Sequence, residues 1–470
     1  MLGGPLSRPS RRETLQALSA LAGARWVGGC APPPADDDPG PQVLAEPLQA
    51  IRHHVIVMME NRSFDHYFGS LSLDEGRDDV DGLRAGMVNL DLAGEAVVPF
   101  ALGHDCLDDL PHSWGSSRLQ FGEGRNDGFV LAHHGGEGET SREAMGYYRR
   151  ADLPVYYALA DDNALCQAWH ASVMGPTWPN RFYSICGTSG GWTKNDFEAV
   201  PFPHRSIFQQ LEDAGVTWKV YYTEFPFPGL VADAAAHSED GHFAFIEDFY
   251  RDCEEGTLPE VAWIEPGYTF NDDHPPHAIA LGQVLIGTLY RALADSPLWG
   301  GSMMVVDYDE HGGLYDHVPP PLTQDDLAEQ GFDQLGFRVP ALVLGPFAKV
   351  GVVTTQYDHT SVLKQLQRRY RLESLTLRNE AANDLADCLD WDRMARQDPR
   401  APTPLTVVEV SRDELDTACV GMAQSGQPEM EHACDVGLIP RSLDARGRRE
   451  EALARLLHRA EKIGLLRVRG

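Results

Sequence analysis

The stretch HHVIVMMENRSFDHYFG, residues 53–69, places polar and charged side chains directly after an apolar run. Residues 55–59 have the composition of a buried parallel strand. In open α/β sheets, ligands collect at the carboxyl ends of such strands, so we expect Glu60 and Asn61 at the rim of a site. The alternative is that residues 60–62 form a solvated loop before a helix that begins near Ser63.

Apolar runs alternate with helical patterns along the chain, which is typical of a largely parallel sheet flanked by helices. The predicted fold class is therefore α/β. The expected strands are residues 55–59, 216–222, 261–264, 303–307 and 340–344, and the expected helices are 155–169, 206–214, 243–254, 278–293, 361–370 and 448–466. Residues 74–102 and 122–140 are rich in glycine and acidic side chains, and we expect them to cover the mouth of the site.

Composition excludes some partners. With 470 residues, of which 43% are hydrophobic, the chain can bury one large core. Its formal charge of −31 argues against nucleic acid, because no basic stripe is present to bind a phosphate backbone. The same charge disfavours sustained docking on anionic lipid.

The N-terminal residues are similar to an export signal. The sequence SRRETL at residues 10–15, followed by a moderately apolar stretch, is similar to a twin-arginine signal, although Thr14 stands where phenylalanine is usual. Residues 27–30 could form a lipobox, in which Cys30 becomes lipidated and attaches the protein to a membrane. We therefore expect an export signal over residues 1–30, a tether over 31–50, contact with the twin-arginine export machinery, and a periplasmic, cell-surface or secreted location.

The eight cysteines form no Cys-x-x-Cys pair, so a zinc knuckle is not expected. In an oxidising compartment some of them should form disulfides, and Cys419 with Cys434 is one candidate pair.

The stretch at residues 53–69 also resembles the opening motif of the bacterial phosphoesterase family that contains phospholipases C and periplasmic acid phosphatases. Four further segments resemble motifs of that family in the same order: DLPHSW (109–114), GPTWPNR (175–181), NDDHPP (271–276) and DYDEHGGLYDHVPP (307–320). The resemblance covers residues 51–371 and implies an alkaline-phosphatase-like catalytic domain. Residues 372–470 are then a small C-terminal extension packed on that domain.

Thr177 is the candidate nucleophile. It lies in a proline-rich turn ahead of a helical pattern that begins near Asn180. A hydroxyl at that place faces the partial positive charge of a helix N-terminus, which suits an incoming phosphate. The residues alone leave open that Thr177 only caps the helix, whereas the resemblance implies a covalent phosphothreonine intermediate.

A divalent metal ion is the expected cofactor. Oxygen ligands follow two separate strands, and buried carboxylates that meet cannot stay ionised without a cation between them. All-oxygen ligation suits Ca²⁺, Mg²⁺ or Mn²⁺, and Zn²⁺ is not excluded. The expected ligands are Glu60, Asn61, Thr177, Asp309 and Glu310. Glu310 departs from a version of the motif with two aspartates, and Asp309 with Glu310 could alternatively cap a helix.

Two histidines, His112 and His274, are the candidates for holding the phosphoryl group and protonating the leaving oxygen. His242 could match a third histidine that binds substrate in the acid phosphatase relatives. For His311 and His317 we favour anchoring of a turn over a place in the pocket.

Two arginines stand next to the motif residues. Arg181 could bind phosphate, but Arg62 and Arg181 could equally pair with Asp65 or Asp316 and brace the loops, which is the reading we favour.

The leading hypothesis is an exported, metal-dependent phosphoesterase that hydrolyses phosphodiesters, including phospholipids, in the manner of a phospholipase C. An acid-phosphatase-type phosphomonoesterase would use the same catalytic residues. Thr177 and the run from Asp309 to Gly313 favour the first reading. An inactive surface lipoprotein would need a missing nucleophile or ligand, and none is missing. A sulfatase-like hydrolase would need cysteine or serine in place of Thr177.

Overall fold

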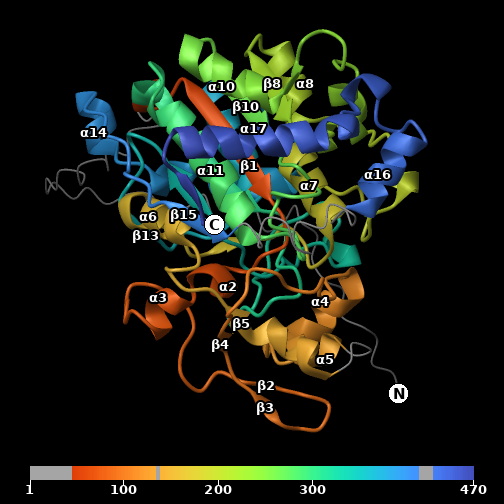
Figure 1. Cartoon of the computed structure of the whole chain (residues 1–470). Helices are drawn as coiled ribbons and strands as arrows, with labels where there is room; N and C mark the ends of the chain where they lie inside the picture. Colours follow the sequence, from red (N-terminus) through yellow and green to blue (C-terminus); the bar gives the residue numbers. More distant parts are fainter. Residues whose placement is uncertain (1–44, 134–137, 412–426, 470) are drawn as a thin grey trace, which may run out of the picture. The chain divides into compact units, whose positions relative to one another are not determined.

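An eight-stranded sheet forms the centre of the computed structural model, which describes residues 45–133, 138–411 and 427–469 (Figure 1). Its strand order is β13-β6-β12-β11-β1-β10-β8-β9. The strands are β1 (His53–Met59), β6 (Ala164–Cys166), β8 (Trp218–Tyr222), β9 (Phe243–Phe245), β10 (Val261–Ile264), β11 (Ser302–Tyr308), β12 (Leu342–Leu344) and β13 (Gly351–Val353). The five strands from β11 to β9 are parallel, which confirms the predicted α/β class with a largely parallel sheet.

The central strand β1 pairs in parallel with β11 on one side and β10 on the other. Its residues from His54 to Met59 are all buried. A parallel strand covered on both faces reads as a continuous apolar run, which is why this segment could be identified from sequence. Met59 is paired with Tyr308, so β1 and β11 end at the same level of the sheet.

Three parts of the sheet differ from the prediction. Strand β12 runs antiparallel to both β11 and β6, and the chain passes from β11 to β12 without an α-helix. The predicted helix 155–169 ends at Asp162, and its second half supplies β6. The predicted helix 243–254 begins instead with the three-residue strand β9.

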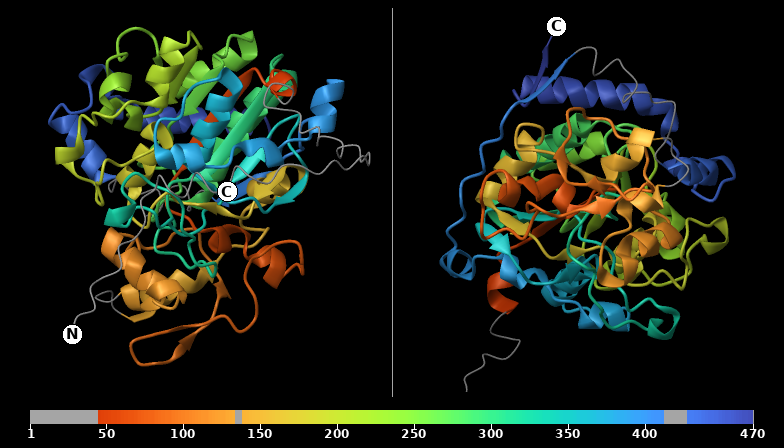
Figure 2. Two further views of the ribbon diagram at one scale, coloured as in Figure 1. Left: turned by 180° about the vertical axis from the view of Figure 1, so that it is seen from behind. Right: turned by 90° about the horizontal axis from the view of Figure 1, so that it is seen from below.

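Helices cover the sheet on both faces (Figures 1 and 2). They are α1 (Ala45–Leu48), α2 (Phe64–Phe68), α3 (Ser70–Leu73), α4 (Trp114–Phe121), α5 (Phe129–Ala132), α6 (Pro154–Asp162), α7 (Thr177–Cys186), α8 (Ile207–Asp213), α9 (Ala232–Ala235), α10 (Ile246–Glu255), α11 (Ile279–Ala294), α12 (Thr360–Tyr370), α13 (Leu377–Ala381), α14 (Trp391–Arg396), α16 (Pro428–Asp435) and α17 (Arg449–Lys462). None of the helices in the described ranges is both long and apolar enough to cross a membrane.

Short strand pairs lie outside the central sheet. They are β2 (Asn89–Leu90) with β3 (Ala96–Val97), β4 (Phe100–Ala101) with β5 (Gly146–Tyr147), β7 (Trp169–His170) with β14 (Tyr357–Asp358), and β15 (Val408–Ser411) with β16 (Leu466–Arg469). The last pair was not expected, because residues beyond 371 carry little strand signal.

The C-terminal helix α17 crosses α11, and its Ala452, Leu456 and Ala460 are buried in the main core (Figure 1). The 14-residue helix ends at Lys462, and only the last residue of its predicted range, Leu466, belongs to β16. Burial of these small and apolar side chains holds the helix against the domain.

Cysteine pairing differs from the prediction. Cys106 is disulfide-bonded, whereas Cys434 is a buried free thiol, so the predicted pair of Cys434 with Cys419 is wrong. Cys419, Cys30, the export signal and most of the tether lie outside the described residues.

Buried charges tie the loops after β1 and β11 together. The Arg338 guanidinium contacts Asp65 at 3.1 Å and Asp316 at 2.9 Å, and His317 Nδ1 lies 2.6 Å from Asp65 Oδ2. Arg62, which we expected to pair with these acids, instead donates to the Asp273 carbonyl oxygen at 2.8 Å. The bracing role holds for Arg62, but its partner is a different loop.

Replacing His317 with glutamine tests this pairing through its pH dependence. Burial opposes the charged imidazole, but the Asp65 carboxylate outweighs burial and raises the pKa of His317. Stability from a raised histidine pKa is complete below the unfolded value of about 6.5 and disappears as pH rises through the folded value. We expect His317→Gln to lower the free energy of unfolding by about 1.5–3 kcal/mol at acidic pH and by less at alkaline pH, as measured by urea denaturation. An equal loss at both pH values would contradict the pairing.

Candidate active site

Polar residues from three predicted motifs meet where β1 and β11 end. The Asn61 N–H donates to Asp309 Oδ1 at 2.9 Å, and the Glu60 N–H donates to the Asp272 carbonyl oxygen at 2.8 Å. Asn61 has a φ of 56°, a left-handed conformation that asparagine adopts more readily than most residues. The turn therefore places Glu60 beside Asp309 at the carboxyl ends of β1 and β11. Both residues are fully buried.

Thr177 is the first residue of α7, three positions before the predicted helix start. Its hydroxyl donates to Glu60 Oε2 at 3.3 Å, and the Trp178 N–H donates to Asn195 Oδ1 at 2.9 Å. The Thr177 side chain caps no backbone N–H in the described structure, because the N-cap position belongs to Pro176. The hydroxyl therefore lies at a helix N-terminus and beside an acid, as a nucleophile for phosphate requires.

Arg181 lies one turn further along α7 and holds Glu60 in place. Its Nε donates to Glu60 Oε1 at 2.8 Å, and its Nη2 donates to the Met58 carbonyl oxygen at 3.0 Å. A second carboxylate, Glu265, lies 3.5 Å from Nη1. These contacts fit a bracing role, but the partners are Glu60 and Glu265 rather than the predicted Asp65 or Asp316. Phosphate binding by Arg181 stays a prediction.

His112 lies at the solvent-facing side of the cluster formed by Glu60, Asp309 and Thr177, with 17% of its side chain exposed. Its Nε2 is 3.4 Å from Asn61 Nδ2 and 3.9 Å from Glu310 Oε1, while its Nδ1 donates to the Leu110 carbonyl oxygen at 2.7 Å. Burial disfavours the charged ring, but Glu310 and Asp109 outweigh burial and raise the pKa of His112 to about 9. A raised pKa suits a proton donor.

The other predicted donor, His274, is a neighbour of His112. The two ring centroids are 5.8 Å apart. His274 Nδ1 donates to the Pro275 carbonyl oxygen at 2.5 Å, which leaves Nε2 for another partner. The structure thus places both predicted proton donors, His112 and His274, on the same side of this cluster.

Three of the five residues predicted to bind a metal ion offer oxygens that fit a cation. Asn61 Oδ1, Asp309 Oδ2 and Glu310 Oε1 are buried, and none has a hydrogen-bond partner within the part of the chain that the structure describes. Burial and the neighbouring Glu310 raise the pKa of Asp309. Buried acceptor oxygens without donors are stabilised by a hard divalent cation.

A second group with metal-ligand geometry adjoins the first. One ligand atom from each of Asp109, His112 and His274 lies within 4.8 Å of the other two.

The structure does not bring His242 to this site, which corrects the prediction. His242 precedes β9, its Nδ1 lies 2.9 Å from the Trp218 carbonyl oxygen, and its Nε2 is 3.5 Å from Glu212. Trp218 begins β8, so His242 lies where the parallel strands start, whereas Glu60 lies where they end. One histidine in a sequence does not reveal which end of a strand it occupies.

Histidines other than the predicted donors orient the acids. His311 Nδ1 lies 3.1 Å from Glu310 and its Nε2 lies 2.7 Å from Gln120 Oε1. His359, which the sequence did not single out, donates from Nε2 to the Asp309 carbonyl oxygen at 2.7 Å. Both are buried, and these contacts hold the Glu310 carboxylate and the Asp309 backbone in place.

Gln427 is the main site residue that sequence reasoning missed. Its Nε2 donates to Thr177 Oγ1 and to Glu60 Oε2, each at 2.9 Å. It lies 250 residues from Thr177 and outside the region of the family resemblance. No motif marks it, so only the folded chain could reveal it.

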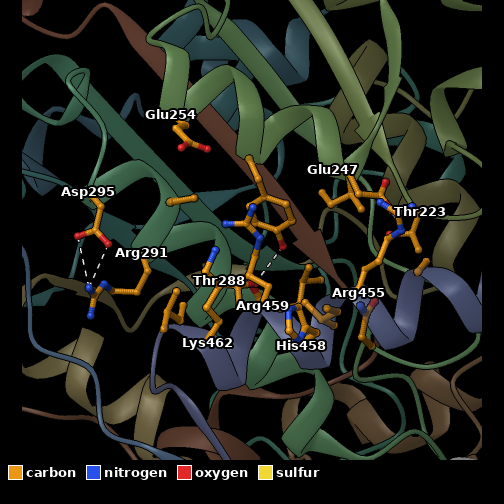
Figure 3. Close-up of a pocket in the computed structure, with 18 of the residues that line it drawn as sticks. Thr223, Glu247, Glu254, Thr288, Arg291, Asp295, Arg455, His458, Arg459 and Lys462 are labelled. Carbon is orange, nitrogen blue, oxygen red and sulfur yellow. Dashed lines mark hydrogen bonds and ion pairs between the residues drawn. The ribbon is translucent and has the colours of Figure 1, made fainter.

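A cavity of about 600 Å³ lies elsewhere, between α10, α11 and α17 (Figure 3). Basic side chains of α17, among them Arg455, Arg459 and Lys462, face it together with Glu247 and the ion pair of Arg291 with Asp295. None of the predicted catalytic residues lines this cavity. Its size alone does not make it the site of chemistry.

Comparison with known proteins identifies the relatives of the chain. The model of the family described as "Phosphoesterase family" matches residues 51–373. Phospholipase C A of Mycobacterium tuberculosis (strain ATCC 25618 / H37Rv) is 33% identical over 435 residues, covering 79% of this chain and 82% of that protein. Non-specific phospholipase C3 of Arabidopsis thaliana is 32% identical over 420 residues, covering 78% and 77%.

Similarity to solved structures is weaker. A protein in the alkaline phosphatase superfamily from Vibrio parahaemolyticus has 12% sequence identity and a TM-score of 0.34, and covers 50% of this chain and 64% of its own. This similarity is too low to support an argument about function.

Proposed function

The chain belongs to the phosphoesterase family and is a hydrolase of phosphoric ester bonds, and from this premise we propose that it cleaves phosphodiesters in the manner of a phospholipase C. The observation that carries the proposal is the Thr177 hydroxyl, which lies at the start of α7 and 3.3 Å from Glu60 Oε2. The phospholipase C names of the compared relatives favour a diester substrate over a monoester.

The proposed reaction has two steps. Thr177 Oγ1 attacks phosphorus and passes its proton to Glu60 Oε2, to which it donates at 3.3 Å, while the bond from phosphorus to the alcohol oxygen breaks and protonated His112 supplies a proton to that oxygen. Water then attacks the phosphothreonine and gives its proton to the now neutral His112, while Oγ1 leaves with the bonding electrons and takes back the proton held by Glu60. The α7 N-terminus faces the negative phosphoryl group throughout.

A divalent ion is part of the proposal. Held by Glu60, Asn61, Thr177, Asp309 and Glu310, it would lower the pKa of the Thr177 hydroxyl and neutralise charge on the phosphoryl oxygens.

The test compares para-nitrophenyl phosphorylcholine with para-nitrophenyl phosphate as substrates of the purified protein, with and without a chelator. Chelator-sensitive cleavage mainly of the phosphorylcholine diester supports the proposal. Cleavage mainly of the monoester would replace it with a phosphatase function. Cleavage of neither substrate by metal-loaded protein would count against both.

Asp309→Asn tests the metal site directly. The substitution keeps the shape of the side chain but removes one carboxylate charge from the ligand set. We expect metal affinity to fall by at least about tenfold and the rate to fall with it, with metal content measured by elemental analysis after dialysis. Asp127→Asn, which alters a carboxylate paired with Arg125 on the surface, is the control. Unchanged metal content and rate in Asp309→Asn would make the carboxylate cluster structural.

Export is also part of the proposal, on the strength of residues 10–15 and the sequence around Cys30. Cell fractionation with Arg11 and Arg12 replaced by lysine tests it. Retention of the variant in the cytoplasm supports the twin-arginine route.

A further inference from the structure

The side chain of Gln427 contacts the proposed nucleophile. Its amide nitrogen lies 2.9 Å from Thr177 Oγ1 and 2.9 Å from Glu60 Oε2, and only 1% of the residue is exposed. The amide therefore donates to the oxygen that would bond to phosphorus. It comes from beyond residue 373, where the match to the family ends.

The segment that carries Gln427 is anchored by apolar packing of α16 and by two ion pairs. Gln427 is the N-cap residue of α16, whose Met430 and Ala433 are buried in the main core. Arg449 forms ion pairs with buried Glu224, near the end of β8, and with Glu431 of α16. The amide is thus held beside Thr177 by packing and charge, which limits the entropy lost when it donates.

An N–H donor at this place matters whenever negative charge forms on Oγ1. Charge develops there as Thr177 loses its proton to attack phosphorus, and again when the bond from phosphorus to Oγ1 breaks during hydrolysis of the phosphothreonine. A donor fixed in a water-excluded site stabilises such charge without reorganisation. We propose that Gln427 is a further residue of the catalytic site, which stabilises Thr177 Oγ1 as the leaving oxygen of the second step. The inference rests on the proposed function.

Gln427→Met tests the inference, because methionine keeps the length of the side chain and removes the donor. With para-nitrophenyl phosphorylcholine the first step expels a good leaving group, so hydrolysis of the intermediate limits turnover. We expect kcat to fall on the order of 100-fold and the fraction of Thr177 that carries a phosphorylcholine adduct to rise above that of the wild type. Acid quench during turnover, followed by peptide mass spectrometry, measures that fraction.

Gln283→Met is the matched control. Gln283 is also buried, and its side chain forms hydrogen bonds with the backbone of Asp152 and Val155, away from Thr177. The variant should change stability without raising the adduct. If Gln427→Met does not fold, Gln427→Asn is used in its place, because the shorter side chain moves the amide donor away by one methylene group. The same fall in kcat and the same rise in the adduct fraction are expected. A kcat and adduct fraction equal to those of the wild type would overturn the inference. A faster variant would also overturn it, because Gln427 would then obstruct the site.

The two proposals fail in different ways. If Thr177 of the wild type forms an adduct that Gln427→Met leaves unchanged, only the role of Gln427 is wrong. If Thr177→Ala still turns over substrate, the proposed function itself is wrong.

Discussion

Thr177→Ala is expected to reduce kcat on the order of a million-fold, because removing a covalent nucleophile leaves no group to form the intermediate. Release of para-nitrophenolate measures the rate. The protein should remain folded, since the change removes one hydroxyl whose described bonds to Glu60 and Gln427 contribute only about 1 kcal/mol each.

Thr177→Ser is the matched control, because it keeps the oxygen at the start of α7 and loses only a methyl group. It should retain measurable turnover and form an adduct on residue 177. Turnover by Thr177→Ala close to that of the wild type would remove Thr177 from the mechanism.

Arg338→Met is expected to lower the free energy of unfolding by about 3–5 kcal/mol. The substitution leaves Asp65 and Asp316 buried without the guanidinium that contacts both. Burial and the neighbouring Asp65 raise the pKa of Asp316, so this acid is poorly stabilised even in the wild type. Guanidinium chloride denaturation followed by circular dichroism measures the loss.

Arg125→Met is the control for this change. The Arg125 side chain is 61% exposed and pairs with Asp127 at 2.8 Å, and solvent screens such surface pairs so that they contribute little to stability. A loss in Arg338→Met no larger than in this control would show that the buried acids are protonated or solvated without Arg338.

Long apolar runs decided how much of the fold could be predicted. The boundaries of β10 were predicted to the residue, and β1 and β11 within two residues, because strands covered on both faces consist largely of a continuous apolar run. The three-residue strand β6 was hidden, since its apolar residues continue the pattern of α6. The antiparallel direction of β12 depends on a long irregular connection, which has no periodicity to interpret.

The part of the site that could be predicted consists of polar residues that directly follow recognisable strands. Glu60 and Asp309 each follow a recognisable strand, and adjacent parallel strands bring their ends together. Gln427 was not predictable, because its role depends on how residues far along the chain pack against α7. Arg181 was assigned two roles from sequence, and its contacts to Glu60 and Met58 favour one of them.

The parallel pairing of β1 with β11 over seven residues has a consequence for how activity is lost on heating. Opening either strand would break up the central sheet, so Glu60 and Asp309 belong to the part of the protein that should unfold last and exchange its amide hydrogens most slowly. Gln427 depends instead on a peripheral segment held by α16 and the Arg449 ion pairs. Mild heating should therefore detach this donor first and yield a slower enzyme whose carboxylates are still in place.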